Sequence, residues 1–229
     1  MKTPEQYFVE DVRLPDVNDK TRALTNAEEA FLDKYLGVDR ERVLAQARRF
    51  DPRGEDVVAG LAPAGEEIPA GEEHSDEKMR AQSEIRLVSF SLLGREYALP
   101  IMVIQEVIRY VKPTKLPAAP LSIAGIVNLR GRVTPLVSLR TLLGIPGDEE
   151  DRFIVVCRHR GLQIGLMINA VSTMYKAGGA DLEWNVEGNV GVHAQLLLGL
   201  YKHGEKLISI LSIDNLVQVV LQGGRAIHA

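Results

Sequence analysis

Short apolar runs separated by glycine-centred turns fill the chain from residue 86 onward, a pattern typical of antiparallel β-hairpins. Glycine suits such turns because it adopts a positive φ without a steric penalty. Each hairpin joins two runs across a tight turn, and we predict four of them: 86–92 with 96–101, 126–129 with 133–137, 153–158 with 162–168, and 196–201 with 206–211. The C-terminal two-thirds of the chain is therefore predicted to be mainly β.

Two of these hairpins run into similar short helical segments. Ser138 precedes leucines at helical spacing, and Ser212 stands before a comparable segment, 213–217. Serine is a preferred N-cap residue because its side chain accepts a hydrogen bond from a free N–H of the first turn. The second half of the region thus echoes the first, which predicts two related β-units in tandem. Two small barrels of about five strands each fit these lengths.

Pro135 lies inside one of the apolar runs, 133–137. Proline has no N–H to donate to a neighbouring strand. We therefore predict that this strand lies at a sheet edge or contains a bulge.

The first 85 residues have a different pattern. Thr25 and Glu28 form a capping box at the start of a predicted amphipathic helix, 25–36, and a second helical pattern begins at Asp39. Residues 51–84 are rich in Gly, Pro and Glu, and such a composition buries too little apolar surface to offset its ordering entropy. We predict a helical extension, a flexible acidic linker, a β-domain and a short tail: 1–50, 51–84, 85–221 and 222–229. The apolar face of helix 25–36 either caps a barrel or docks on another protein.

Composition and charge exclude several classes of function. Apolar residues make up 45% of the 229 residues, as in ordinary globular proteins, and no apolar run reaches the ~18 residues of a membrane-spanning helix. The net charge of −4 divides into −8 over residues 1–85 and +4 over residues 86–229. Because the basic residues form no run and the head is acidic, we expect no nucleic acid as partner. The N-terminus lacks the pattern of a signal peptide, and the single cysteine excludes an intrachain disulfide, so we expect a cytoplasmic protein without direct membrane insertion.

No residue pattern points to catalysis, a metal or a cofactor. Cys157 and His159 are two apart in a predicted strand and share a face, but a metal or nucleophile–base site needs further groups that the sequence does not supply. A buried structural cysteine is the expectation. Trp184, in a polar stretch, is expected to cover the core.

The β-region resembles the CheW family of bacterial chemosensory adaptors over about residues 84–221. The motifs that carry the resemblance stand in order along the chain: FSLLGREYALPI, VIQEVI, the LP of KLPAAP, GIVNLRG, VTPLVSLRTLLG and RFIVVCRHRGLQIGLMINAV. The resemblance implies two five-stranded β-barrels related by a pseudo-twofold axis and no enzymatic activity. It also implies two partners, a CheA-type histidine kinase and the cytoplasmic domain of a methyl-accepting chemoreceptor, assembled into arrays beneath the membrane.

Carried over to this chain, the contact positions of the family are Ile104, Glu106, Gly125, Asn128 and Arg130. We predict that Arg130 pairs with Glu106 beside the receptor-facing groove; the alternative is a solvated turn cation. We expect the apolar run 101–108 to be buried on both faces. The alternative is that part of this run stays exposed and forms a groove for a receptor helix.

This chain departs from the family pattern at two positions. Ser138 replaces the usual aspartate of a P-x-x-D-L motif and is a comparable N-cap. Asn169 replaces the aspartate of a V-D-x-V motif, so any ionic contact there is in doubt. Two other functions stay open: the same adaptor in a non-flagellar pathway such as pilus motility or development, with the N-terminal extension choosing the partner, or an enzyme or small-molecule-binding β-protein.

Overall fold

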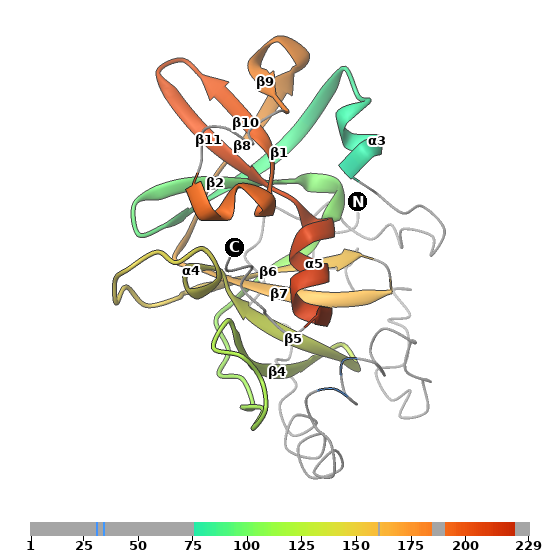
Figure 1. The fold of residues 1–229 in the computed structure, drawn as a ribbon, viewed down its shortest axis with the longest axis vertical. Coiled ribbons are helices and arrows are strands. Elements are labelled where there is room, and N and C mark those ends of the chain that lie inside the picture. The colour runs from blue at the N-terminus through green and yellow to red at the C-terminus, as the bar shows by residue number, and fades with distance from the viewer. Residues whose placement is uncertain (1–30, 32–33, 35–75, 160, 185–190, 223–229) are drawn as a thin grey trace, which may run out of the picture.

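The structure is a computed structural model that describes residues 31, 34, 76–159, 161–184 and 191–222. Strands form most of it, joined by short helices (Figure 1). The strands are β1 (Glu84–Leu92), β2 (Arg95–Pro100), β3 (Ile104–Arg109), β4 (Ile123–Leu129), β5 (Arg132–Ser138), β6 (Phe153–His159), β7 (Leu162–Ile168), β8 (Ala170–Gly178), β9 (Leu182–Glu183), β10 (Leu197–His203) and β11 (Lys206–Leu211). The helices are α3 (Asp76–Arg80), η3 (Ile101–Val103), α4 (Leu139–Leu142), η4 (Gly179–Asp181), η5 (Gly191–Leu196) and α5 (Ile213–Gln222).

All four predicted hairpins are confirmed. They are β1–β2, β4–β5, β6–β7 and β10–β11, each antiparallel. The mainly β prediction for the C-terminal two-thirds is therefore correct.

The strands form two sheets, and each sheet takes strands from both halves of the domain. The order is β3-β6-β7-β5-β4 in the five-stranded sheet and β8-β1-β2-β11-β10-β9 in the six-stranded sheet. If β1–β5 are matched with β6, β7, β8, β10 and β11, the two orders become identical except for the additional strand β9, and each sheet then has its parallel pair at the same place. The repeat is confirmed, but its two units exchange strands; each barrel is not built from one unit alone.

Each sheet curls until its far strands approach each other. In the six-stranded sheet three strands separate β8 from β10, yet the rings of Tyr175 (β8) and Tyr201 (β10) have centroids 5.4 Å apart. In the five-stranded sheet β3 and β4 are the two edges, and the turn after β4 reaches β3. We call these meeting places the aromatic seam and the ionic seam. Two barrel-like subdomains result, as predicted.

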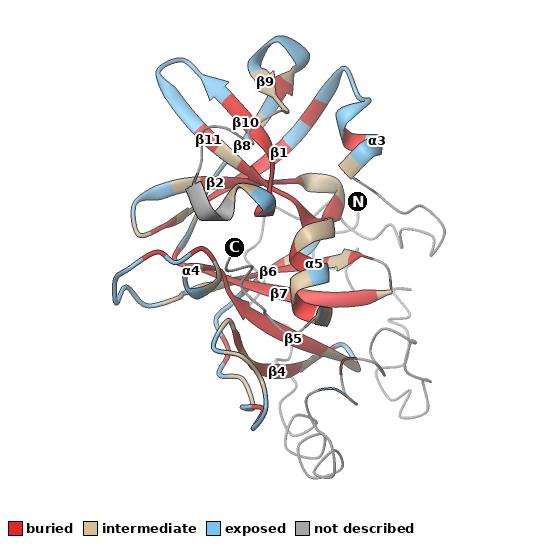
Figure 2. Cartoon of the chain, in the orientation of Figure 1, coloured by how far each residue is buried: buried red, intermediate tan, exposed pale blue. Residues whose placement is uncertain are grey.

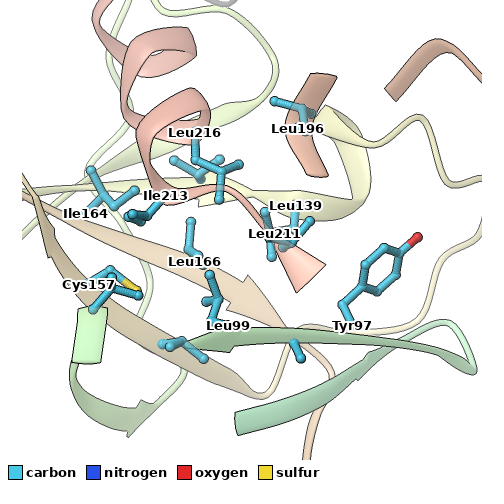
Figure 3. Packing of buried hydrophobic residues seen from close by; sticks show 14 of the residues in the cluster. Tyr97, Leu99, Leu139, Cys157, Ile164, Leu166, Leu196, Leu211, Ile213 and Leu216 are labelled. Atoms are coloured by element: carbon cyan, nitrogen blue, oxygen red, sulfur yellow. The ribbon is translucent and has the colours of Figure 1, made fainter. Parts of the chain in front are cut away.

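A shared apolar core holds the two sheets together. Figure 2 shows most buried positions gathered along the strands, while many exposed ones lie in the turns and loops. The main cluster combines Leu99 of β2, Leu166 of β7 and Leu216 of α5, all fully buried (Figure 3). A smaller cluster lies on the other face of the five-stranded sheet and includes Ile154 and Val156 of β6. Helix α5 packs against β6 and thereby joins the end of the chain to this core.

The strand that contains Pro135 is not at a sheet edge, and the geometry around Pro135 explains why. Strand β5 lies between β7 and β4, so it is not an edge strand. Pro135 faces Ile126, whose N–H and C=O bond to Thr114 on the other side of β4. The nitrogen of Pro135, which carries no hydrogen, therefore points toward β7, where pairing with β5 begins only at Leu136. The sheet tolerates the proline because no ladder bond is due at its nitrogen.

Both serine caps are confirmed. The Ser138 hydroxyl accepts a hydrogen bond from the Thr141 N–H at 3.3 Å, and the Ser212 hydroxyl accepts one from the Asn215 N–H at 3.0 Å. Serine thus replaces the family's aspartate at position 138 without loss of the cap.

The boundaries at the N-terminal side need one correction. The predicted linker ran to residue 84, but residues 76–80 form α3 and β1 begins at Glu84. Met79, fully buried in the main cluster, supplies the apolar anchor that the composition of the linker concealed. The rest of the predicted linker, the tail beyond Gln222 and most of the extension 1–50 lie outside the described residues.

The six-stranded sheet has one strand more than expected. The short strand β9 pairs with β10, and the Trp184 that follows it lies over Gly199. A Cβ at Gly199 would stand 2.8 Å from Cε3 of Trp184, so only glycine admits the indole this close. Trp184 packs against the main cluster and covers it, as predicted.

Candidate partner-binding site

The turn between β4 and β5 presents Arg130 in a left-handed backbone conformation. Arg130 and Gly131 have φ values of +52° and +74°, and Leu129 pairs with Arg132 across them. This is a two-residue hairpin turn in which both central residues need a positive φ. The conformation costs a residue other than glycine about 1–2 kcal/mol, so arginine is a costly choice at position 130.

The side chain of Arg130 crosses the ionic seam to Glu106. Its Nη2 lies 2.8 Å from Oε2 of Glu106, which confirms the predicted pair. The two partners differ in environment, because the Arg130 side chain is 77% exposed and that of Glu106 only 11%. The pair therefore links the two edges of the five-stranded sheet and still presents most of a guanidinium to the outside.

A bulge in β3 sets the direction of Glu106. Ile104 pairs with Cys157 and Glu106 with Val156, so Gln105 is an extra residue on β3. Because of this extra residue, Ile104 packs on the main cluster whereas Glu106 shares a face with Val156, a member of the smaller cluster.

The neighbouring apolar residues confirm burial on both faces of β3. Val107 belongs to the main cluster and Ile108 to the smaller one, while Ile101, Met102 and Ile104 are half-buried.

Gly125 and Asn128 contribute to the site in different ways. Gly125 has a φ of +147°, and a Cβ there would stand 2.3 Å from the backbone oxygen of Thr114. This close approach fixes the loop before β4 against the strand, so Gly125 shapes the site. Asn128, half-buried on β4, has a buried Oδ1 that accepts no hydrogen bond within the part of the chain that the structure describes.

The groups considered for catalysis or metal binding are engaged within the domain. Cys157 is fully buried in the main cluster, and burial raises the pKa of its thiol far above the ordinary value. Nε2 of His159 lies 2.5 Å from Oδ1 of Asp214. Among the described residues, no three His, Cys, Asp or Glu side chains gather in a way that would hold a metal ion. In those same ranges, no helix is both long and apolar enough to span a bilayer.

Asn169 holds a junction that the sequence did not reveal. It lies between β7 and β8, where the chain passes from the five-stranded to the six-stranded sheet. Its Oδ1 accepts from the Leu93 N–H at 3.0 Å, and its Nδ2 donates to the carbonyls of Glu150 at 2.9 Å and Glu149 at 3.4 Å. An amide satisfies this mixture of donor and acceptors, so the position works without an ionic contact. In the sequence, the departure of Asn169 from the aspartate of the family motif was the signal that this position has a particular role.

Comparison with known proteins agrees with this architecture. The sequence profile of the CheW-like domain matches residues 86–220, more than half of the chain. Chemotaxis protein CheW of Helicobacter pylori is 27% identical over 155 residues, which cover 66% of this chain and 90% of that protein. Chemotaxis protein CheW of Thermotoga maritima is 29% identical over 142 residues, or 61% of this chain and 92% of that protein.

A solved structure gives the same result. The chain resembles the scaffolding protein TtCheW from Thermoanaerobacter tengcongensis with a TM-score of 0.52 and 27% identity, over 58% of this chain and 86% of that one. The matched region contains both sheets, the exchanged strands and the Arg130–Glu106 pair. The chain therefore belongs to the CheW-like domain family.

Proposed function

We propose that this protein is a non-enzymatic adaptor that joins the cytoplasmic domain of a methyl-accepting chemoreceptor to the regulatory domain of a CheA-type histidine kinase. The observation that carries the proposal is the family match over residues 86–220, the whole two-sheet domain. The relatives are named chemotaxis proteins, and the similar solved structure is described as a scaffolding protein. Recruitment to receptor arrays is part of the same proposal.

We place the partner contact at the ionic seam, over Ile104, Glu106, Gly125, Asn128 and Arg130. The left-handed backbone at Arg130 costs about 1–2 kcal/mol relative to glycine. An ion pair whose arginine is 77% exposed contributes about 0–1 kcal/mol to the free energy of unfolding. Because glycine at this position would be at least as stable, stability alone does not account for the arginine, and a role in contact with a partner does.

The test separates stability from binding. Arg130→Gly should leave the free energy of unfolding within about 1 kcal/mol of wild type, because relief of the backbone offsets the lost pair. Binding to the kinase regulatory domain from the same genome should weaken about tenfold or more, which calorimetry would measure. The matched control is Glu205→Gly, which changes an exposed residue in the equivalent turn between β10 and β11 and should leave affinity unchanged.

A charge exchange tests the pair itself. Glu106→Arg should impair binding, and the added change Arg130→Glu should restore part of it. A double variant no better than either single variant would show that the pair is not coupled in binding. A folded wild-type protein that does not bind the kinase domain would refute the assignment of the kinase as partner.

One relative favours a second pathway in which this adaptor would act. Protein PilI of Pseudomonas aeruginosa is 28% identical over 89 residues, which cover 38% of this chain and half of that protein. The same adaptor chemistry in a pilus-linked pathway is therefore the second candidate. Deletion of the gene distinguishes the two, because loss of swimming supports the flagellar pathway and loss of surface motility alone supports the other.

A further inference from the structure

Helix α5 holds residues from the N-terminal side of the chain at its first turn. The Asp76 N–H, at the start of α3, donates to Oδ2 of Asp214 at 2.9 Å. In return, the hydroxyl of Ser212, the N-cap of α5, donates to the carboxylate of Asp76. A side chain of α5 thus caps the start of α3, and a side chain of α3 holds the serine that caps α5.

Two further contacts fix this arrangement. Nε2 of His159 lies 2.5 Å from Oδ1 of Asp214, so a buried imidazole at the end of β6 orients the carboxylate that caps α3. Met79 of α3 is fully buried in the main cluster. A helix of five residues has little stability alone, so these contacts account for its presence.

The last turn of α5 holds a second segment from still earlier in the chain. Nζ of Lys34 donates to the backbone carbonyl of Leu221 at 2.8 Å, across 187 residues of sequence. A cation is favoured there because the last carbonyls of a helix lack intrahelical partners and carry partial negative charge. Phe31 is three residues earlier in helical backbone, so it shares a face with Lys34, and it is 1% exposed within the main cluster.

Figure 1 shows these two anchors at opposite ends of α5. Helix α3 lies beside its start, and the two short blue pieces, residues 31 and 34, lie beyond its end. An α-helix of ten residues is about 15 Å long, so the anchors are separated by most of the helix length.

We propose that α5 is an intramolecular docking surface for the N-terminal segment of this chain, which binds it in cis at Phe31 and Lys34 and again at α3. The docked residues occupy the two ends of α5 and withhold those ends from other proteins. The family profile begins at residue 86, so Phe31, Lys34 and α3 lie outside the region that it matches. The inference does not depend on which partner the ionic seam binds.

Cross-linking in the full-length chain tests the cis contact. The chain has one cysteine, Cys157, which is fully buried and therefore does not compete for a reagent. The pair Lys34→Cys and Gln218→Cys, the latter at an exposed position on α5, should cross-link with a short bismaleimide into a monomeric product whose yield is unchanged on dilution. The control pair joins Lys34→Cys to Lys206→Cys, an exposed position at the start of β11, and should stay unlinked. A dimeric product, or equal yields from both pairs, would overturn the proposal.

Hydrogen exchange tests whether the docked segment protects α5. In Phe31→Ala, the amides of residues 213–222 should exchange about tenfold faster than in wild type, while those of β7 keep their protection. Lys34→Ala should give a smaller change in the same peptide, and Lys112→Ala, which removes an exposed lysine from the loop after β3, should give none. Unchanged exchange in α5, or equal acceleration in α5 and β7, would refute local docking.

Discussion

Replacement of Asn169 by aspartate is the sharpest single test of how the two sheets are joined. The substitution changes one amide nitrogen into an oxygen and almost nothing else in shape. Asn169 is 3% exposed, its Oδ1 accepts from the Leu93 N–H, and its Nδ2 donates to the carbonyls of Glu149 and Glu150. An ionised carboxylate keeps the first bond but is an acceptor only. Its second oxygen would face two carbonyl oxygens with no proton between them.

The expected cost follows from these bonds. A buried polar group left without its partner costs about 1–3 kcal/mol, and repulsion between the carboxylate and two carbonyls adds to it. We expect Asn169→Asp to lower the free energy of unfolding by about 2–4 kcal/mol at neutral pH. At the roughly 2–4 °C per kcal/mol of a chain this size, the melting temperature falls by roughly 4–16 °C.

The loss should depend on pH in a defined direction. A protonated carboxyl group regains a donor for the Glu150 carbonyl, so the folded state raises the pKa of the new carboxyl group. A raised pKa in the folded state means that stability declines as pH rises through that pKa. The difference from wild type should therefore be small at acid pH and largest at neutral pH.

Chemical denaturation at several pH values measures this difference. Asn215→Asp is the matched control, since it also removes an Nδ2 that donates to a carbonyl, that of Gln195, but in an exposed bond at the start of α5. A carboxylate is favoured near a helix N-terminus, so this control should cost less than about 1 kcal/mol. An Asn169→Asp variant as stable as wild type at neutral pH, or one whose loss is independent of pH, would refute the reasoning.

Three further predictions concern the site, the α3 anchor and the core. Gly125→Ala should destabilise the domain by about 2–4 kcal/mol, because the new Cβ would overlap the backbone oxygen of Thr114. Gly131→Ala should cost only about 1–2 kcal/mol, because the space around Gly131 is open. Equal melting temperatures of the two variants would contradict this prediction. Burial raises the pKa of Asp76, so the stability that its protonated carboxyl group contributes is lost as pH rises through that pKa. Asp76→Asn should remove this part of the decline in stability with pH, and an unchanged pH profile of unfolding in the variant would contradict the prediction. Burial also raises the pKa of the Cys157 thiol, so alkylation at mildly alkaline pH should require unfolding, and labelling of the native protein at the rate of a free thiol would contradict that.

Local chemistry made part of this fold predictable. A glycine in a tight turn and a serine before a helical run act within a few residues, and so the hairpins and the caps at Ser138 and Ser212 could be placed from the sequence. The family motifs also placed Arg130 and Glu106 at one site, and their ion pair is present.

Contacts between distant residues were not predictable in the same way. The exchange of strands between the two halves, the central place of the Pro135 strand and the close approach of Thr114 to Gly125 depend on which segments meet in space. Helix α3 was hidden for the same reason, since its composition resembles a linker and Met79 and Asp76 hold it through contacts with residues far away in sequence. A pattern of single residues carries no record of such partners.

The two seams show that the fold itself does not require a charged pair at the candidate site. At the aromatic seam His203, the last residue of β10, packs on Tyr175 of β8, with ring centroids 4.8 Å apart, whereas at the ionic seam the turn after β4 reaches β3 through Arg130 and Glu106. One sheet thus curls with aromatic rings in contact and a glycine at the positive φ of its turn, Gly204. The other places an arginine in the left-handed conformation and leaves most of its guanidinium exposed. Since the turn between β10 and β11 closes an equivalent sheet with glycine in that conformation, the fold does not require arginine at position 130, which agrees with the partner contact proposed for this site.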